Sequence, residues 1–231
     1  LIKSRSIIFC LNRDYCFEAL KYGLPLAIHA IGGIAVSLSD RFILARLTTL
    51  EDIGFYAVAG QIVAIFIFAV DAFNRAYSPW LFSVLSEGKP EAYNRIVKGT
   101  YVYFISIFLL AIIFAKFSEW FLRFAFVGKY LDAIEFIFPL CLAAAFMGMY
   151  YMVTLYLQFA KRTKQLASIT LIVGGINILL SIKLVEWYGA IGASYASICT
   201  QFLMFFACWI AAAYFFPMPW VSTLRKKLRS N

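Results

Sequence analysis

The chain has 231 residues, of which 63% are hydrophobic and 19% aromatic, and its formal net charge is +9. Charged residues make up 14% of the chain, against about 25% in an ordinary soluble domain, and the mean hydropathy is +0.82. A soluble domain of this size could not bury so much apolar surface. The composition therefore excludes a soluble protein and indicates an integral membrane protein.

Six stretches of the sequence are apolar over the roughly 20 residues that a bilayer core requires. We expect the second and longest to be kinked at Pro79, or to extend its last turns into the headgroup layer, and the fourth to be kinked at Pro139. The stretch 117–132 is too aromatic for a free loop, which predicts an interfacial helix or a hinge lying on the membrane surface. The predicted fold is an all-α integral membrane bundle of six transmembrane helices. These spans cover approximately residues 24–45, 54–84, 96–116, 133–159, 166–187 and 190–215.

The distribution of Lys and Arg predicts the orientation of the bundle. Fourteen of these 21 residues lie on one predicted side of the membrane and five on the other, while Arg41 and Arg75 lie inside spans. Cytoplasmic loops are enriched in Lys and Arg, so we expect both termini in the cytoplasm. Topology and contact with anionic lipid headgroups explain the positive net charge, and no nucleic-acid partner is expected. We expect residues 1–19 to form a cytoplasmic segment, 20–217 the six-helix unit, and 218–231 a basic cytoplasmic tail.

Two pairs of opposite charges, Asp40 with Arg41 and Asp71 with Arg75, interrupt the apolar spans. Ionised side chains at membrane depth are costly, and they tend to face a bundle interior or a watery cavity that marks a transport path. Asp71 and Arg75 are four residues apart on one helix face and can pair directly. Asp40 and Arg41 are adjacent, point about 100° apart, and need partners elsewhere. Each arginine either extends to a headgroup layer or faces the cavity, whereas the aspartates are too short to reach the headgroups.

Other polar and small residues lie within the predicted spans. His29 is either a hydrogen-bonded packing residue or a titrating or ligand-binding group. Asn74, one turn beyond the second aspartate, is expected to line the same polar stripe, and Asn177 to form an inter-helix hydrogen bond. Paired glycines at 32–33 and 174–175 permit either close helix contact or bending.

The sequence offers no recognisable catalytic or metal-binding arrangement. It contains a single histidine and five cysteines without a CxxC spacing, so we expect no metal site and no cofactor. We find no Gly-rich phosphate loop, no paired catalytic carboxylates and no Ser/His/Asp arrangement, and we therefore expect no enzyme.

Five loose motifs stand in order along the chain and resemble those of one transporter family. Together they resemble the C-terminal half of bacterial polysaccharide flippases of the Wzx type, within the multidrug/oligosaccharidyl-lipid/polysaccharide exporter superfamily. The resemblance covers about residues 17 to 215. The motifs are LKYGLPL (20–26), DRFIL (40–44), GFYAVAGQ (54–61), AFNRAYSPWLFSVL (72–85) and YGAIGASYAS (188–197).

The resemblance implies a two-lobe transporter with a cavity between two six-helix lobes. Such flippases move undecaprenyl-pyrophosphate-linked O-antigen repeat units from the cytoplasmic to the periplasmic leaflet of the inner membrane, for lipopolysaccharide synthesis. This chain would be the second lobe, with the bilayer, the lipid-linked oligosaccharide and a missing N-terminal lobe as partners. Arginine suits the pyrophosphate because it can bind a phosphate bidentately. The candidate cavity residues are Arg41, Arg75, Asp40, Asp71, Asn74 and His29.

Three alternatives remain for the function. A cation-coupled drug or small-molecule antiporter of the same superfamily would bind Na⁺ or H⁺ at intramembrane carboxylates, but two arginines balance the two acids. A membrane-embedded glycan polymerase or acyltransferase would need a catalytic His or carboxylate with a polar loop, which the short loops do not offer. A non-transporting scaffold would also be compatible with six spans.

Overall fold

The computed structural model describes residues 13–125 and 130–220, and within these ranges the chain is helical almost throughout. Its six long helices are each long and apolar enough to span a membrane, which confirms the six predicted spans. A short 3₁₀ turn, η1 (Leu131–Ala133), leads into the fourth helix. The helices are α1 (Arg13–Leu47), α2 (Leu50–Ser86), α3 (Pro90–Ala125), α4 (Ile134–Phe159), α5 (Thr163–Tyr188) and α6 (Ile191–Phe215).

Two helices extend beyond the predicted bounds. α1 begins at Arg13, so residues 13–19 are helical and continuous with the first span. α3 continues to Ala125, so the predicted surface helix or hinge over 117–132 is wrong for residues 117–125. Residues 1–12 and 126–129 lie outside the described residues, as does the basic tail from 221 onward.

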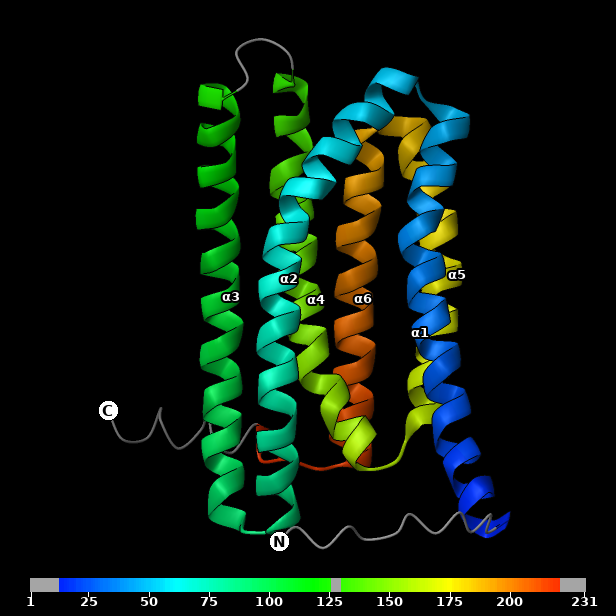
Figure 1. Cartoon of the computed structure of the whole chain (residues 1–231), viewed down its shortest axis with the longest axis vertical. Helices are drawn as coiled ribbons and strands as arrows, with labels where there is room; N and C mark the ends of the chain where they lie inside the picture. Colours follow the sequence, from blue (N-terminus) through cyan, green and yellow to red (C-terminus); the bar gives the residue numbers. More distant parts are fainter. Residues whose placement is uncertain (1–12, 126–129, 221–231) are drawn as a thin grey trace, which may run out of the picture.

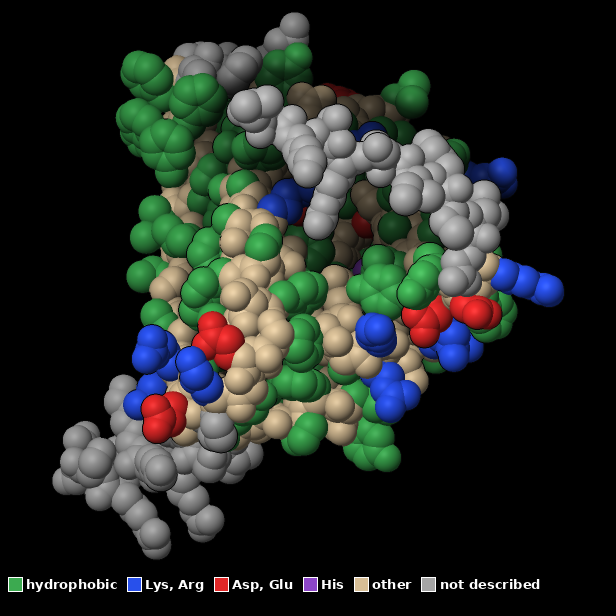
Figure 2. Space-filling model, turned by 60° about the horizontal axis from the view of Figure 1, so that its bottom comes forward, with side chains coloured by type: hydrophobic (Ala, Val, Ile, Leu, Met, Phe, Trp, Pro, Cys, Tyr) green, Lys and Arg blue, Asp and Glu red, His purple; other side chains and the backbone are tan. Residues whose placement is uncertain are grey.

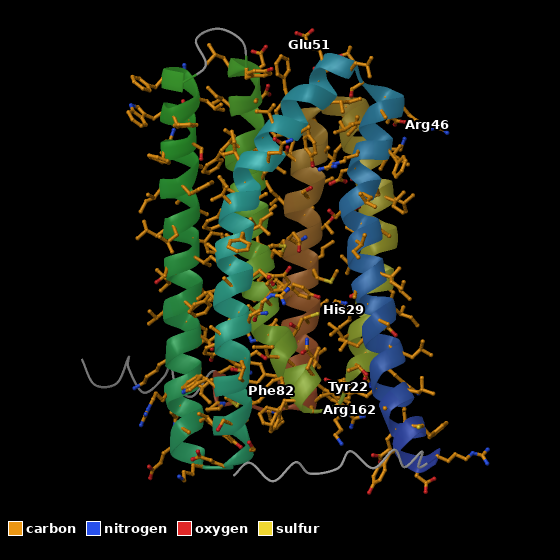
Figure 3. All side chains as sticks on the ribbon, viewed as in Figure 1. Tyr22, His29, Arg46, Glu51, Phe82 and Arg162 are labelled. Atoms are coloured by element: carbon orange, nitrogen blue, oxygen red, sulfur yellow. The ribbon has the colours of Figure 1, made fainter. Side chains whose placement is uncertain are left out.

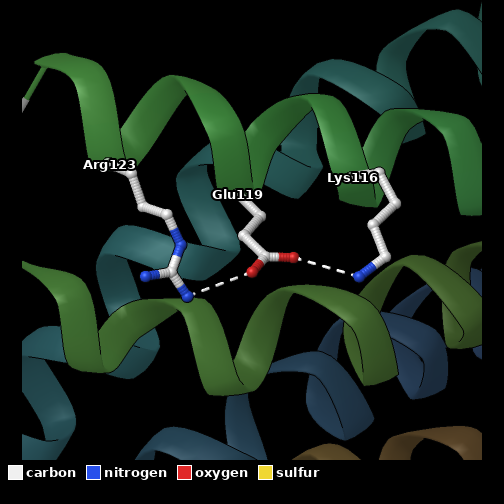
Figure 4. A network of polar contacts seen from close by, with 3 residues as sticks. All are labelled: Lys116, Glu119 and Arg123. Carbon is white, nitrogen blue, oxygen red and sulfur yellow. Dashed lines mark hydrogen bonds and ion pairs between the residues drawn. The ribbon is translucent and has the colours of Figure 1, made fainter.

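The extension of α3 has a local electrostatic reason. Glu119 accepts a hydrogen bond from Lys116 at 3.2 Å and another from Arg123 at 3.1 Å, one turn away on either side (Figure 4). Charge pairs with these spacings stabilise a helix. The mixed aromatic and charged composition of this segment therefore belongs to the last turns of a long helix.

α4 and α6 form the centre of the bundle (Figure 1). α4 packs against α6, α3 and α2 and is the most buried of the six helices, whereas α5 packs on the other side of α6. α1 packs mainly against α5 and has few contacts with α2. α1 begins and α6 ends at the same end of the bundle, at the bottom of Figure 1.

α1 and α5 run parallel and in register. The pairs Tyr22–Thr163 and His29–Thr170 are both hydrogen-bonded and both separated by 141 residues in sequence. The helices also approach closely, because a Cβ added to Gly174 would lie 2.9 Å from Val36 Cγ2. Between helices in lipid, small residues and inter-helix hydrogen bonds replace the hydrophobic effect as the driving force.

α1 and α2 meet at one end of the bundle and diverge below it. The Thr49 side chain caps α2 in a capping box with Asp52, directly after α1 ends at Leu47. Farther down, α1 lies on α5 and α2 on α4. Seen from the lower end, the space-filling view has a hollow between the helices, with charged side chains at its rim and within it (Figure 2).

The chain after α6 packs back onto the bundle. Met218 and Trp220 are buried, and Tyr101 of α3 donates a hydrogen bond to the Trp220 carbonyl at 3.2 Å. Residues 218–220, which we assigned to the basic tail, therefore pack against the six-helix unit.

Candidate functional site

Asp40 in α1 is the one buried acidic or basic residue among residues 13–125 and 130–220, with 6% of its surface exposed. Three hydroxyl groups from three other helices donate hydrogen bonds to its carboxylate. Ser181 of α5 donates to Oδ1 at 2.9 Å. Ser197 of α6 and Tyr56 of α2 donate to Oδ2 at 3.0 and 3.4 Å. Asp40 therefore joins four helices through neutral donors.

No neighbouring cation in the described part of the chain balances the charge of Asp40. Arg41 is exposed, points about 100° away around the helix, and takes part in none of the ion pairs between described residues, although it interacts electrostatically with Tyr56. Lys183 pairs with Glu186 at 2.8 Å. The prediction that Asp40 and Arg41 do not pair with each other is confirmed.

A second polar group lies next to Asp40 along the same helix contact. Ser39 donates a hydrogen bond to Asn177 Oδ1 at 3.0 Å, and Asn177 Nδ2 donates to Thr200 Oγ1 at 2.8 Å. The predicted inter-helix hydrogen bond of Asn177 is thus confirmed, and it joins α5 to both α1 and α6.

His29 joins α1 to α4 and α5 (Figure 3). Its Nδ1 lies 2.5 Å from Thr170 Oγ1, and its Nε2 lies 2.9 Å from Tyr150 Oη. Because the Thr170 hydroxyl donates to the Leu166 carbonyl, Nδ1–H donates to Thr170 and Nε2 accepts from Tyr150. Both ring nitrogens are used inside the protein, which favours the packing interpretation of this residue.

Asp71 and Arg75 form an ion pair on α2, as their spacing predicts. Arg75 Nε lies 2.6 Å from Asp71 Oδ2, and the two side chains are 79% and 35% exposed, respectively. Phe73, two residues from Asp71, stacks on Tyr103 of α3 with ring centroids 4.9 Å apart. Two residues correspond to about 200° around a helix, so the ion pair lies on the flank of α2 away from α3.

Two adjacent tyrosines of α4 connect the polar groups on α1 and α2. Tyr151 interacts electrostatically with both Asp71 and Arg75, while its neighbour Tyr150 contacts His29. The two tyrosine rings lie 5.5 Å apart, centroid to centroid. Neighbouring residues of α4 therefore interact with the histidine and with the ion pair.

Asn74 adds an unsatisfied acceptor near the ion pair. Its Oδ1 is buried and accepts no hydrogen bond from the described residues. Leaving a buried acceptor unpaired costs about 1–3 kcal/mol.

The structure places the six candidate residues in separate groups. Asp71, Asn74 and Arg75 share one region of α2, and His29 on α1 is hydrogen-bonded to Tyr150 of α4. Asp40 lies seven residues before the end of α1, close to the end of the bundle where α1 and α2 meet, whereas Asp71 lies 21 residues into the 37-residue α2, near its middle. Arg41 is exposed next to Asp40 and forms no ion pair with Asp71.

The protein partners of Asp40 and His29 were not identified from the sequence. The sequence contains a signal for the partners on α5. The α5 residues that contact α1 recur about every two helical turns, at Thr163, Thr170 and Asn177. The unidentified partners are Tyr56, Tyr150, Thr170, Ser181 and Ser197.

Neither a metal cluster nor a known relative identifies the site. Among the residues that the structure describes, no group of three or more His, Cys, Asp or Glu side chains could hold a metal ion. Comparison with protein-family models, curated proteins and solved structures finds no match to this chain.

Proposed function

We propose that this chain is one lobe of a flippase that moves undecaprenyl-pyrophosphate-linked oligosaccharide repeat units across the bacterial inner membrane. The observation that carries the proposal is the exposed guanidinium of Arg75, ion-paired with Asp71 on an otherwise apolar helix. A charge so exposed on a membrane-spanning helix is accommodated by a headgroup layer, a watery cavity or a facing protein surface. A flippase of two lobes supplies the cavity and the facing surface.

The chemistry of this region suits a phosphate-bearing, sugar-bearing substrate. Asp71 takes a hydrogen bond from Nε of Arg75, and the terminal nitrogens of the guanidinium have no partner among the described residues. Those two nitrogens are the pair that binds a phosphate bidentately. The Tyr151 hydroxyl, which interacts electrostatically with the ion pair, can bond sugar hydroxyls.

We expect the chain on its own not to transport, because its exposed polar groups need a facing lobe. Residues 1–231 expressed in a strain that lacks its flippase should leave surface polysaccharide absent. The same lobe joined to a first lobe should restore it, as measured by immunoblotting of the polysaccharide. Restoration by the single chain would contradict this expectation.

In the proposed orientation, the N- and C-termini of the chain both lie in the cytoplasm. Thr49 precedes α2 and Pro90 begins α3, so they lie at opposite ends of the bundle. In a background without native cysteines, a membrane-impermeant thiol reagent should label cysteine at 49 in intact spheroplasts and cysteine at 90 only after permeabilisation. The reverse pattern, or labelling of both from one side, would contradict the orientation.

A cation-coupled antiporter is the second candidate function, and Asp40 supports it. In the sequence, the two aspartates within the spans are balanced by two arginines, which argues against a cation-binding site. Asp71 does pair with Arg75, but Asp40 has only hydroxyl partners in the described residues. Transport assays distinguish the two functions. An antiporter should transport cationic drugs, and a flippase should transport lipid-linked oligosaccharide.

A further inference from the structure

An open cavity lies between α3 and α4, at the end of the bundle where α1 and α2 meet (Figure 1). Its volume is about 280 Å³, and it has charged side chains on its α3 wall and apolar side chains on its α4 wall. We propose that this cavity binds the headgroup of one phosphatidylethanolamine molecule. The inference is independent of which substrate the lobe carries. The lining residues are Ala115, Lys116 and Glu119 of α3 and Ile134, Ile137 and Phe138 of α4.

The charged side of the cavity belongs to a triad of residues on α3. Glu119 accepts hydrogen bonds from Lys116 through Oε2 and from Arg123 through Oε1, and the three side chains share one face of the helix (Figure 4). Each contact uses one N–H group of the cation, which leaves other N–H groups of Lys116 and Arg123 to bind a phosphate. Each carboxylate oxygen of Glu119 likewise retains a lone pair that can accept a hydrogen bond from an ammonium group. The triad therefore complements a ligand that carries a phosphate and a primary ammonium group close together.

The triad lies at the depth of the lipid headgroups. No charged residue occurs between Lys98 and Lys116, and this stretch of α3 is about 25 Å long. A hydrocarbon core is about 30 Å thick, so the uncharged stretch spans most of it and Lys116 begins the headgroup layer. Phe117, Trp120 and Phe124 are exposed on the other face of the same turns, as aromatic residues at a membrane–water interface are.

The apolar wall of the cavity favours a lipid over a soluble phosphate compound. Ile134 begins α4 at this end of the bundle, and Ile137 and Phe138 follow one turn deeper in the membrane. Ile137 is buried in the core, whereas Phe138 is exposed next to it. A lipid whose headgroup meets Lys116 and Glu119 therefore lays its acyl chains along Phe138.

The carboxylate of Glu119 selects among phospholipid headgroups. Phosphatidylglycerol offers a phosphate but no cation, so Glu119 would repel its headgroup. Phosphatidylcholine carries a cation, but its quaternary nitrogen has no N–H group to donate. Of these three lipids, only phosphatidylethanolamine supplies both a phosphate for the two basic side chains and N–H donors for the carboxylate.

The test measures the thermal unfolding of the purified, delipidated 231-residue chain in detergent, by intrinsic tryptophan fluorescence. The dioleoyl forms of the three phospholipids are titrated at constant detergent concentration, beside water-soluble glycerophosphoethanolamine. We expect phosphatidylethanolamine alone to raise the midpoint in a saturable way, by about 5–10 °C at a hundredfold excess over its dissociation constant. Glu119→Gln should abolish this response, measured from its own lipid-free midpoint. Glu186→Gln, the matched control in the exposed ion pair with Lys183, should keep it.

A second variant keeps the proposal testable if Glu119→Gln does not fold. Arg123→Gln retains the ion pair between Lys116 and Glu119 and removes a phosphate donor, so it should weaken the apparent affinity for phosphatidylethanolamine about tenfold or more. Coincident curves for the three phospholipids would overturn the proposal, as would a full response in Glu119→Gln. A larger response to phosphatidylglycerol would identify a site for anionic lipid, and an equal response to glycerophosphoethanolamine would identify a site for the headgroup alone. Either result would also overturn the proposal.

Discussion

Arg75→Ala, in a two-lobe flippase that carries this lobe, is expected to reduce flipping of the lipid-linked oligosaccharide at least tenfold. The guanidinium is 79% exposed, and it uses Nε for Asp71, which leaves its terminal nitrogens for phosphate. Losing one charge-assisted hydrogen bond costs about 1.5–3 kcal/mol, which corresponds to a factor of ten or more in rate. Arg75→Lys should be partly active, because it keeps the charge and loses the bidentate geometry. The assay is the transfer of labelled repeat units across inverted membrane vesicles.

The controls for this prediction separate substrate binding from structure. Removing Arg75 alone leaves Asp71 without its partner, so the double variant Asp71→Asn with Arg75→Gln removes both charges and keeps similar shapes. If the double variant folds and flips normally, the pair is neither a substrate site nor a gate. Arg41→Ala should also lower flipping, because Arg41 is exposed and has no ion-pair partner among the described residues. If Arg41→Ala also flips the substrate normally at normal protein levels, the proposal that arginine side chains of this lobe bind the substrate is wrong.

Gly192→Ala should destabilise the lobe by about 3 kcal/mol, a large share of the 5–15 kcal/mol that stabilises a typical domain. α5 and α6 are joined by a tight turn in which Gly189 adopts φ 71°, a conformation that favours glycine. A Cβ on Gly192 would lie 2.1 Å from the Leu184 carbonyl oxygen and 2.7 Å from the Val185 nitrogen. Both are backbone atoms, so no rotamer change could relieve the clash. The measurement is the thermal midpoint in detergent, with size-exclusion chromatography of the expressed protein.

A glycine in open space provides the matched control for Gly192. A Cβ on Gly33 would meet nothing within 4 Å, so Gly33→Ala should leave the midpoint unchanged or raise it slightly, as expected from the higher helix propensity of alanine. Equal midpoints for Gly192→Ala and the unmodified protein would show that the turn adjusts, contrary to the prediction.

Features that depend on neighbouring residues in the sequence could be predicted, because their causes are local. Each span is a continuous apolar run, and the Asp71–Arg75 pair follows from a spacing of four residues on one helix. The wrong prediction of a surface helix or hinge over 117–125 also concerns a feature with a local cause. Lys116, Glu119 and Arg123 have the spacing of helical ion pairs, and their pattern would have predicted that α3 continues.

The surroundings of Asp40 and His29 could not be predicted in the same way. Ser181 and Ser197 lie 141 and 157 residues from Asp40, and serine in an apolar span carries no hydropathy signal of its own. Which helix lies beside which is decided by packing between spans that all resemble one another in composition. The recurrence of Thr163, Thr170 and Asn177 at intervals of seven does mark one face of α5, but it does not name α1 as its partner.

The register between α1 and α5 has a consequence for biosynthesis. α1 finds its main partner 141 residues later in the chain, and its hydrogen-bonding groups at His29 and Asp40 need that partner. At about 5–20 residues per second, the ribosome needs roughly 7–28 s to make the intervening chain. During that interval a newly made α1 must remain beside the translocation machinery or in lipid, with its carboxylate and imidazole lacking their partners on α5. The lobe therefore assembles late, once α5 has entered the membrane.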